Sequence, residues 1–283
     1  MAYSGHTLLP HLKVLQHQLL SGLEEDDEKF RSTYFDLELL PYALGCTWHA
    51  LSELARIQNA IISKYPPERI TGVVFYGLPN EDRDLLSYMV DNFLDASRRA
   101  QNSVLHYLSR SLSISLPSSM SDLVKKMEAG KIKLPELPHA ETLTYWSKYG
   151  RQLKDYRDLA QHHALATSDA RLILSDGRVG VYLLLPSNPE VKSAGRLIFG
   201  NPEVHAFPFA LAQFKALVFY LGWLTRGLVS SCAEDRKQAV FHVFRDMASL
   251  GPGVTYGAYI PPSANKLQTT IEEWLQKVRE AGG

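Results

Sequence analysis

Stretches with apolar residues at helical spacing fill most of this 283-residue chain, and they constrain its fold more than any other feature. Apolar side chains recur every three or four positions over residues 7–20, 35–63, 80–110, 140–166 and 207–228. This period is that of a helix with one face buried against a core. We therefore predict a mainly α-helical protein, a helical bundle, with the strongly apolar segment 207–228 at its centre.

Residues 171–185 contain the clearest departure from helical periodicity. Two runs rich in aliphatic residues flank Asp176-Gly177, a pair that supplies the positive φ angles of a two-residue hairpin turn. We predict a small antiparallel β-hairpin or ribbon here, with Gly177 at positive φ. Shorter apolar runs at residues 70–76, 196–199 and 254–260 are candidates for additional strands.

The other segments fit a single domain over residues 1–283. Pro41 lies near the start of the predicted helix 35–63, where a proline costs least. Asn80 is placed to cap the helix 80–110. Helical patterns also cover residues 121–129 and 234–250, and an amphipathic helix begins at residue 263. We predict that Phe93, Trp146 and Leu153 share one core, because the two helices that contain them turn apolar faces inward at these positions.

The composition argues against some classes of protein but does not indicate a particular function. Thirty basic residues balance thirty acidic ones, so the surface as a whole does not favour nucleic acid or membranes. The apolar stretch 216–224 is shorter than the roughly 20 residues that span a bilayer, and the N-terminus has no signal-like pattern. We expect a cytoplasmic protein without a membrane span. Cys46 and Cys232 are expected to be buried, reduced thiols.

No motif for a metal or a cofactor is evident in the sequence. The ten histidines and two cysteines lack the paired spacing of a zinc site. Glycine-rich phosphate loops and nucleophile elbows are also missing from the sequence. We interpret Arg98-Arg99 and Lys125-Lys126 as solvated charges, and the aromatic residues between 199 and 223 as core packing.

The segment from Arg157 to His163 is the strongest candidate for chemistry. Asp158 and His162 are four residues apart, so both project from one helix face. A carboxylate beside an imidazole orients its tautomer and raises its pKa, and a neighbouring guanidinium recognises phosphate. Arg157, Asp158, His162 and His163 are therefore candidate catalytic residues for metal-free cleavage of RNA. The alternative is a structural role, in which Asp158 and His162 form a pair on the helix surface and Arg157 forms a salt bridge.

Two stretches of the chain resemble the HEPN superfamily. Residues 91–100, followed by Val104-Leu105, are similar to its first core helix. Residues 145–162 are similar to its last core helix, in which an arginine precedes a histidine by four to six intervening residues. Arg157 with His162 or His163 fits that spacing. The resemblance covers residues 80–166, and the predicted β-ribbon and C-terminal helices occupy residues 170–283.

The resemblance implies an up-down helical bundle that forms a homodimer. It also implies either a metal-independent ribonuclease, with Arg–His motifs from two subunits facing one cleft, or an inactive binding or scaffold module. Asp158 follows the arginine at a position where the family often has asparagine. We therefore keep two hypotheses: an RNA nuclease that uses this motif, and a non-catalytic helical binding or scaffold protein in which Arg157 and His162 are structural.

Overall fold

A computed structural model describes most of the chain, as residues 8–20, 23, 28–65, 73–162, 169–175, 178–191 and 193–231. Several predictions fall outside these described residues. They concern the segments 234–250 and 254–260, the helix from residue 263, Cys232, His163 and the φ angle of Gly177.

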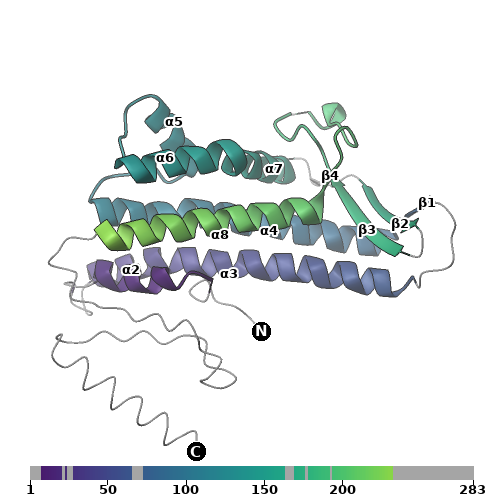
Figure 1. The fold of residues 1–283 in the computed structure, drawn as a ribbon, viewed down its shortest axis with the longest axis horizontal. Coiled ribbons are helices and arrows are strands. Elements are labelled where there is room, and N and C mark those ends of the chain that lie inside the picture. Colours follow the sequence, from purple (N-terminus) through teal and green to yellow (C-terminus); the bar gives the residue numbers. More distant parts are fainter. Residues whose placement is uncertain are drawn as a thin grey trace, which may run out of the picture.

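Helices dominate the described residues, as the periodicity predicted. Three long helices lie side by side (Figure 1): α3 (Glu28–Ser63), α4 (Asn80–Leu112) and α8 (Ala206–Ser231). On one side of them lie α5, α6, a π-helical turn and α7, and α2 packs against α3 and α8. The bounds of the shorter elements are Pro10–Leu20 for α2, Met120–Glu128 for α5, Glu136–Tyr145 for α6, Trp146–Gly150 for the π-helical turn and Arg151–His162 for α7.

Helix α3 is longer than its sequence pattern indicated, and this changes the role of Pro41. The proline lies in the interior of a helix that begins at Glu28, not near its start as predicted. A proline has no N–H, so the carbonyl four residues earlier, that of Leu37, loses its helical partner. The buried Tyr107 of α4 donates its hydroxyl proton to that carbonyl, at 2.8 Å. This tertiary hydrogen bond therefore replaces the helical hydrogen bond that Pro41 cannot make.

The start of α4 also differs from the prediction. Pro79 occupies the N-cap position, without a side-chain hydrogen bond, and Asn80 is the first helical residue. Glu81 and Asp82 lie in the first turn, where negative charge favours a helix.

The described strands form one antiparallel sheet in the order β1-β2-β3-β4. The register pairs Ser175 of β2 with Arg178 of β3, which confirms the predicted two-residue hairpin connection. The candidate strand at 70–76 is observed as β1 (Val73–Gly77). The prediction of a strand at 196–199 was wrong, because a 3-10 turn covers Ala194–Arg196 and the fourth strand is instead Val204–His205. The bounds of β2 and β3 are Asp169–Ser175 and Arg178–Leu185.

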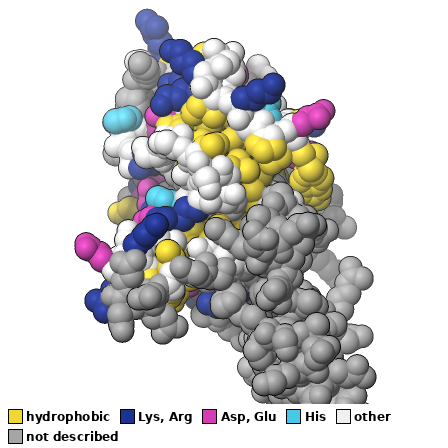
Figure 2. Space-filling model, turned by 90° about the vertical axis from the view of Figure 1, so that its left-hand side faces the viewer, with side chains coloured by type: hydrophobic (Ala, Val, Ile, Leu, Met, Phe, Trp, Pro, Cys, Tyr) yellow, Lys and Arg dark blue, Asp and Glu magenta, His cyan; other side chains and the backbone are white. Residues whose placement is uncertain are grey.

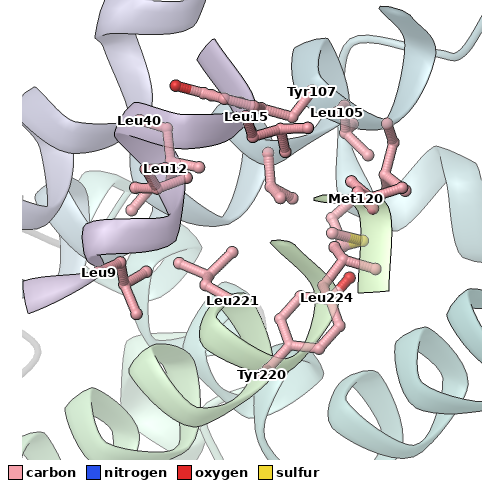
Figure 3. Close-up of a cluster of buried hydrophobic side chains, with 14 of the residues drawn as sticks. Leu9, Leu12, Leu15, Leu40, Leu105, Tyr107, Met120, Tyr220, Leu221 and Leu224 are labelled. Atoms are coloured by element: carbon pink, nitrogen blue, oxygen red, sulfur yellow. The ribbon is translucent and has the colours of Figure 1, made fainter. Parts of the chain in front are cut away.

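Buried hydrophobic side chains form two clusters that both use α3, α4 and α8. The first cluster joins these helices to α2, α5 and α6. Figure 3 shows part of it, with Leu12 and Leu15 of α2 near Leu40 of α3, and Leu221 and Leu224 of α8 nearby. The second cluster joins the same three helices to α7 and the sheet. The side chains that link the bundle to the sheet therefore belong mainly to the second cluster.

The predicted core of Phe93, Trp146 and Leu153 is only partly correct. Phe93 and Leu153 are both fully buried in the second cluster. Trp146 is half-buried and packs against the first cluster instead. The π-helical turn that begins at Trp146 inserts one extra residue per turn, so the indole leaves the helix face on which Leu153 lies.

Helix α8 is the central apolar helix that the sequence predicted. By length and composition, its residues Ala206–Thr225 would also suffice to cross a membrane. In the bundle the helix packs against α2, α3, α4 and α6, and 44% of this segment is buried. Its aromatic residues are mostly in contact with the clusters, but Phe219 is exposed, contrary to the interpretation as core.

One end of the bundle brings apolar side chains to the surface. Figure 2 shows hydrophobic side chains across the middle of this end, with lysine and arginine side chains above them. Leu112, Ile114 and Leu116, at the end of α4 and just after it, are half-buried against the first cluster. This apolar surface continues the core outward.

Candidate functional site

Helix α7 holds the described residues of the predicted site, and its buried face fixes how they point. Leu153, Tyr156 and Leu159 are buried, three positions apart along the helix. The Tyr156 hydroxyl donates a hydrogen bond to the carbonyl of Pro186 at 2.6 Å, and its ring meets Phe209 edge-on, with ring centroids 4.6 Å apart. These contacts set the rotation of α7 about its axis, so its polar residues point outward or toward α4.

Arg157 turns toward α4. Its Nη2 lies 3.5 Å from an Asp95 carboxylate oxygen, and its Nη1 lies 3.7 Å from one of Asp158. Its Nε is buried and has no hydrogen-bond partner among the residues that the structure describes. The guanidinium therefore faces carboxylates of its own chain, and its side chain is only 28% exposed.

The spacing of Asp158 and His162 predicts only that both side chains project from one helix face. In the structure the two residues also line one cavity. The cavity has a volume of about 410 Å³ and lies between α7 and the segment after β3. Arg157 is not among its lining residues. Those residues are Lys154, Asp155, Asp158, Leu159 and His162 from α7, with Pro189, Glu190 and Val191 opposite.

The lining of this cavity is predominantly acidic. Asp155, Asp158 and Glu190 supply three carboxylates, against one ammonium from Lys154 and one imidazole from His162. Lys154 Nζ donates to Asp158 at 2.7 Å and lies 3.4 Å from Asp155. Burial opposes the charge of Lys154, but the hydrogen bond to Asp158 and the two negative charges together raise its pKa. The lining therefore carries more carboxylates than basic groups, and the Arg157 guanidinium lies just outside it, 3.7 Å from Asp158.

A buried arginine lies beside this region, and the sequence interpretation missed it. Arg98 is only 8% exposed, so its interpretation as a solvated charge was wrong. Its guanidinium donates to Gln101 Oε1 and lies 5.8 Å from the centroid of the Trp146 ring. Burial lowers its pKa, and the negative charge of Asp158 opposes this. Arg98 has the helical spacing of the buried residues Leu94, Gln101 and Leu105, a signal that could have revealed its burial.

The π-helical turn lies beside this arginine, which it contacts through the Trp146 ring. Gln101 donates from Nε2 toward the Tyr145 hydroxyl at 3.4 Å. A Cβ atom added at Gly150 would lie 2.5 Å from the same Nε2, so a larger residue at this position would force Gln101 to shift. Irregular π turns within helices often occur at functional sites. Here Trp146 of the turn lines a second cavity, of about 320 Å³, that shares Lys154 and Asp155 with the first.

The acidic and histidine side chains that the structure describes in this region do not form a metal-ligand cluster. Within the part of the chain that the structure describes, no group of three or more His, Cys, Asp or Glu side chains is arranged to hold a metal ion. Cys46, expected to be buried, is a half-buried free thiol.

Comparison of the chain with family models, with curated proteins and with solved structures finds no match. The resemblance to the HEPN superfamily therefore stays a prediction based on residues 91–105 and 145–163.

Proposed function

We propose that this protein is a non-catalytic helical binding or scaffold protein whose cavity beside α7 accepts a basic group of a partner protein. The observation that supports this proposal is the net negative lining of the cavity by Asp155, Asp158 and Glu190. A lysine or arginine side chain of a partner would offset that charge at close range. An RNA phosphate would be repelled by the same three carboxylates.

The direction of Arg157 favours this proposal over a nuclease within one chain. Residues five positions apart on an α-helix point about 140° apart around its axis, so Arg157 and His162 lie on different faces of α7. Arg157 already pairs with Asp95 and Asp158. A role in holding α7 against α4 accounts for these contacts without any substrate.

The proposal is tested by binding of a fluorescently labelled hexa-arginine peptide to the full chain. We expect saturable binding that weakens as salt is raised, because screening acts on exposed charges. Replacing both Asp158 and Glu190 by their amides should weaken it at least tenfold. The matched control is Glu81→Gln with Asp84→Asn, which removes two charges from the distant first turns of α4. Equal loss in both double variants, or no binding at all, would reject the basic-group site.

A metal-independent ribonuclease is the second candidate. Its support is the exposure of His162 at a cavity that also contains Asp158, since this pair could orient and move a proton. This candidate predicts cleavage of single-stranded RNA in the presence of a chelator, with cyclic phosphate products and no cleavage of DNA. His162→Ala would then reduce the rate by ~10²–10⁴-fold.

The control for that assay is Gln161→Ala, since Gln161 is also exposed and precedes His162 directly. We expect no cleavage by the wild type or by either variant. Cleavage that persists in chelator, is lost in His162→Ala and is kept in Gln161→Ala would replace the binding proposal by the nuclease.

A further inference from the structure

The outer face of α3 differs from the outer faces of most surface helices, because it is apolar. Phe35, Leu39 and Tyr42 are 68%, 46% and 65% exposed. They follow one another at intervals of four and three residues, so they form one stripe along the helix. The opposite face of the same helix, with Leu37, Leu40 and Leu44, is fully buried in the core. The first half of α3 is therefore apolar on both sides.

The stripe continues as charged residues at both ends. Three or four positions separate each successive member, so all of them lie on one face of α3. We call this whole set the α3 stripe. It comprises Glu28, Arg31, Phe35, Leu39, Tyr42, Cys46, His49, Glu53 and Arg56. The mean spacing from residue 28 to residue 56 is close to that of the seam of a coiled coil.

We propose that the α3 stripe is the interface of a homodimer in which two α3 helices cross in antiparallel orientation at Tyr42. A two-fold axis at this position pairs each residue with the residue whose number is 84 minus its own. Glu28 then faces Arg56 of the second copy, and Arg31 faces Glu53. Such an isologous contact needs a self-complementary surface, and the order of charges along the stripe is self-complementary in this direction.

A parallel arrangement would bring like charges together, because each residue would face its own counterpart. Glu53 and Arg56 already form an ion pair within the chain, with Arg56 Nη2 2.7 Å from the carboxylate. In the antiparallel dimer this pair would extend into a four-charge cluster with Arg31 and Glu28 of the second copy. Charge complementarity therefore selects the antiparallel orientation.

The apolar part of the α3 stripe is too small to form a stable interface by itself, so its charged ends must also contribute to the interface. Stable interfaces bury about 800 Å² on each partner, and each large apolar side chain can supply about 150–250 Å². Phe35, Leu39 and Tyr42 alone fall short of this area. The full stripe extends over about 42 Å of helix, which brings it to the lower end of specific interfaces.

The proposed dimer also determines where the α7 cavities of the two copies would lie. Figure 1 shows α4 and α8 between α3 and α7, so a two-fold axis at α3 leaves the two α7 helices on the outer sides of the dimer. The two Arg157 and His162 sets would not face a common cleft. The inference does not depend on the proposed function, but it does not fit a composite nuclease site.

The first test measures the mass of the full chain by sedimentation between about 1 and 100 μM, a range suited to weak interfaces. We expect a concentration-dependent dimer for the wild type and a monomer for Tyr42→Glu. Tyr88→Glu is the matched control, because Tyr88 is 58% exposed on α4, and it should dimerise like the wild type. A wild type that stays monomeric, or a dimer that survives Tyr42→Glu, would overturn the proposal and assign the stripe to another occupant or to none.

The second test fixes the register by disulfide formation in a Cys46→Ser, Cys232→Ser background. Tyr42→Cys should form a covalent dimer under mild oxidation, since the two introduced thiols would meet at the axis. Arg31→Cys with Glu53→Cys should also cross-link between chains, because the two positions are about 33 Å apart within one α3. Tyr88→Cys should remain a monomer under the same conditions. Cross-linking of Tyr88→Cys as efficiently as Tyr42→Cys would contradict the proposed interface.

Discussion

The outer faces of α7 and α3 lie on opposite sides of the bundle. They differ in whether their side chains find partners within the same chain. On α7, Lys154 and Arg157 contact carboxylates of the same chain within 3.7 Å. On α3, Phe35 and Tyr42 expose large apolar surfaces to solvent. Charges on a helix surface cost little free energy whether paired or solvated. Large apolar side chains in a row point more strongly to a missing partner.

The residues best suited to catalysis are therefore not those with the clearest sign of an external partner. The motif on α7 attracts attention because histidine, arginine and aspartate can catalyse reactions. The α3 stripe contains no such motif, yet its contacts within the described chain account for it less completely.

The largest effect is expected for Phe93→Ala, beneath α7, compared with Tyr42→Ala on the α3 stripe. Phe93 is fully buried, so its truncation should lower the free energy of unfolding by roughly 3–5 kcal/mol. Tyr42→Ala should change the unfolding free energy of the monomer by less than ~0.5 kcal/mol. Urea denaturation at low protein concentration measures both. Similar losses in the two variants would mean that the outer face of α3 is not open.

A smaller loss is expected for Gly150→Ala at the end of the π-helical turn. The added Cβ would lie 2.5 Å from Gln101 Nε2 and 3.0 Å from Trp146, so the buried side chains must shift, at a cost of about 1–3 kcal/mol. Gly227→Ala in α8 is the control, because nothing lies within 4 Å of its added Cβ. It should be neutral or slightly stabilising. Equal thermal stability of the two variants would contradict the close packing of Gly150 against Gln101 and Trp146.

The third prediction concerns Asp91, one turn before Asp95 on α4. Burial raises the pKa of this carboxyl to about 6, and its Oδ1 lacks a hydrogen-bond partner among the described residues. A folded-state pKa above the unfolded value means that the folded protein binds the proton more tightly. The stability contributed by the protonated form is thus present at pH 4 and is lost as the pH rises through 6.

Asp91→Asn should therefore remove a fall in stability between pH 4 and pH 7. At pH 7 the variant should be more stable than the wild type, by ~1 kcal/mol or less once the partial exposure of Asp91 is allowed for. At pH 4 the two should match. Thermal unfolding at several pH values measures the difference, and Asp84→Asn on the same helix serves as the control. A difference in stability between the variant and the wild type that stays constant with pH would show that titration of Asp91 is not its cause.

The smallest effect is expected for Asp95→Asn, which removes a carboxylate from Arg157. The pair is partly exposed and 3.5 Å apart, so the loss of stability should be under ~0.5 kcal/mol. The more informative readout is RNA binding in low salt, since the freed guanidinium could then contact phosphate. We expect no gain, because Asp158 and the cavity carboxylates remain. Tighter RNA binding by Asp95→Asn than by Asp84→Asn would weaken the contrast between the two faces.

The sequence alone was enough to predict the mainly helical fold, the hairpin connection and the common helix face of Asp158 and His162. Each of these follows from periodicity or from a short-range turn preference, which act within one segment. Tertiary structure alone decided the partners of three residues. Helical spacing assigns Arg98 to the buried face of α4, but its contact with the Trp146 ring comes from the packing of two helices. Arg157 points to Asp95 because Tyr156 and Leu159 fix the rotation of α7. Pro41 is tolerated in a helix interior because Tyr107 reaches the carbonyl of Leu37. Such contacts join residues far apart in the chain, and no local pattern specifies which helices meet.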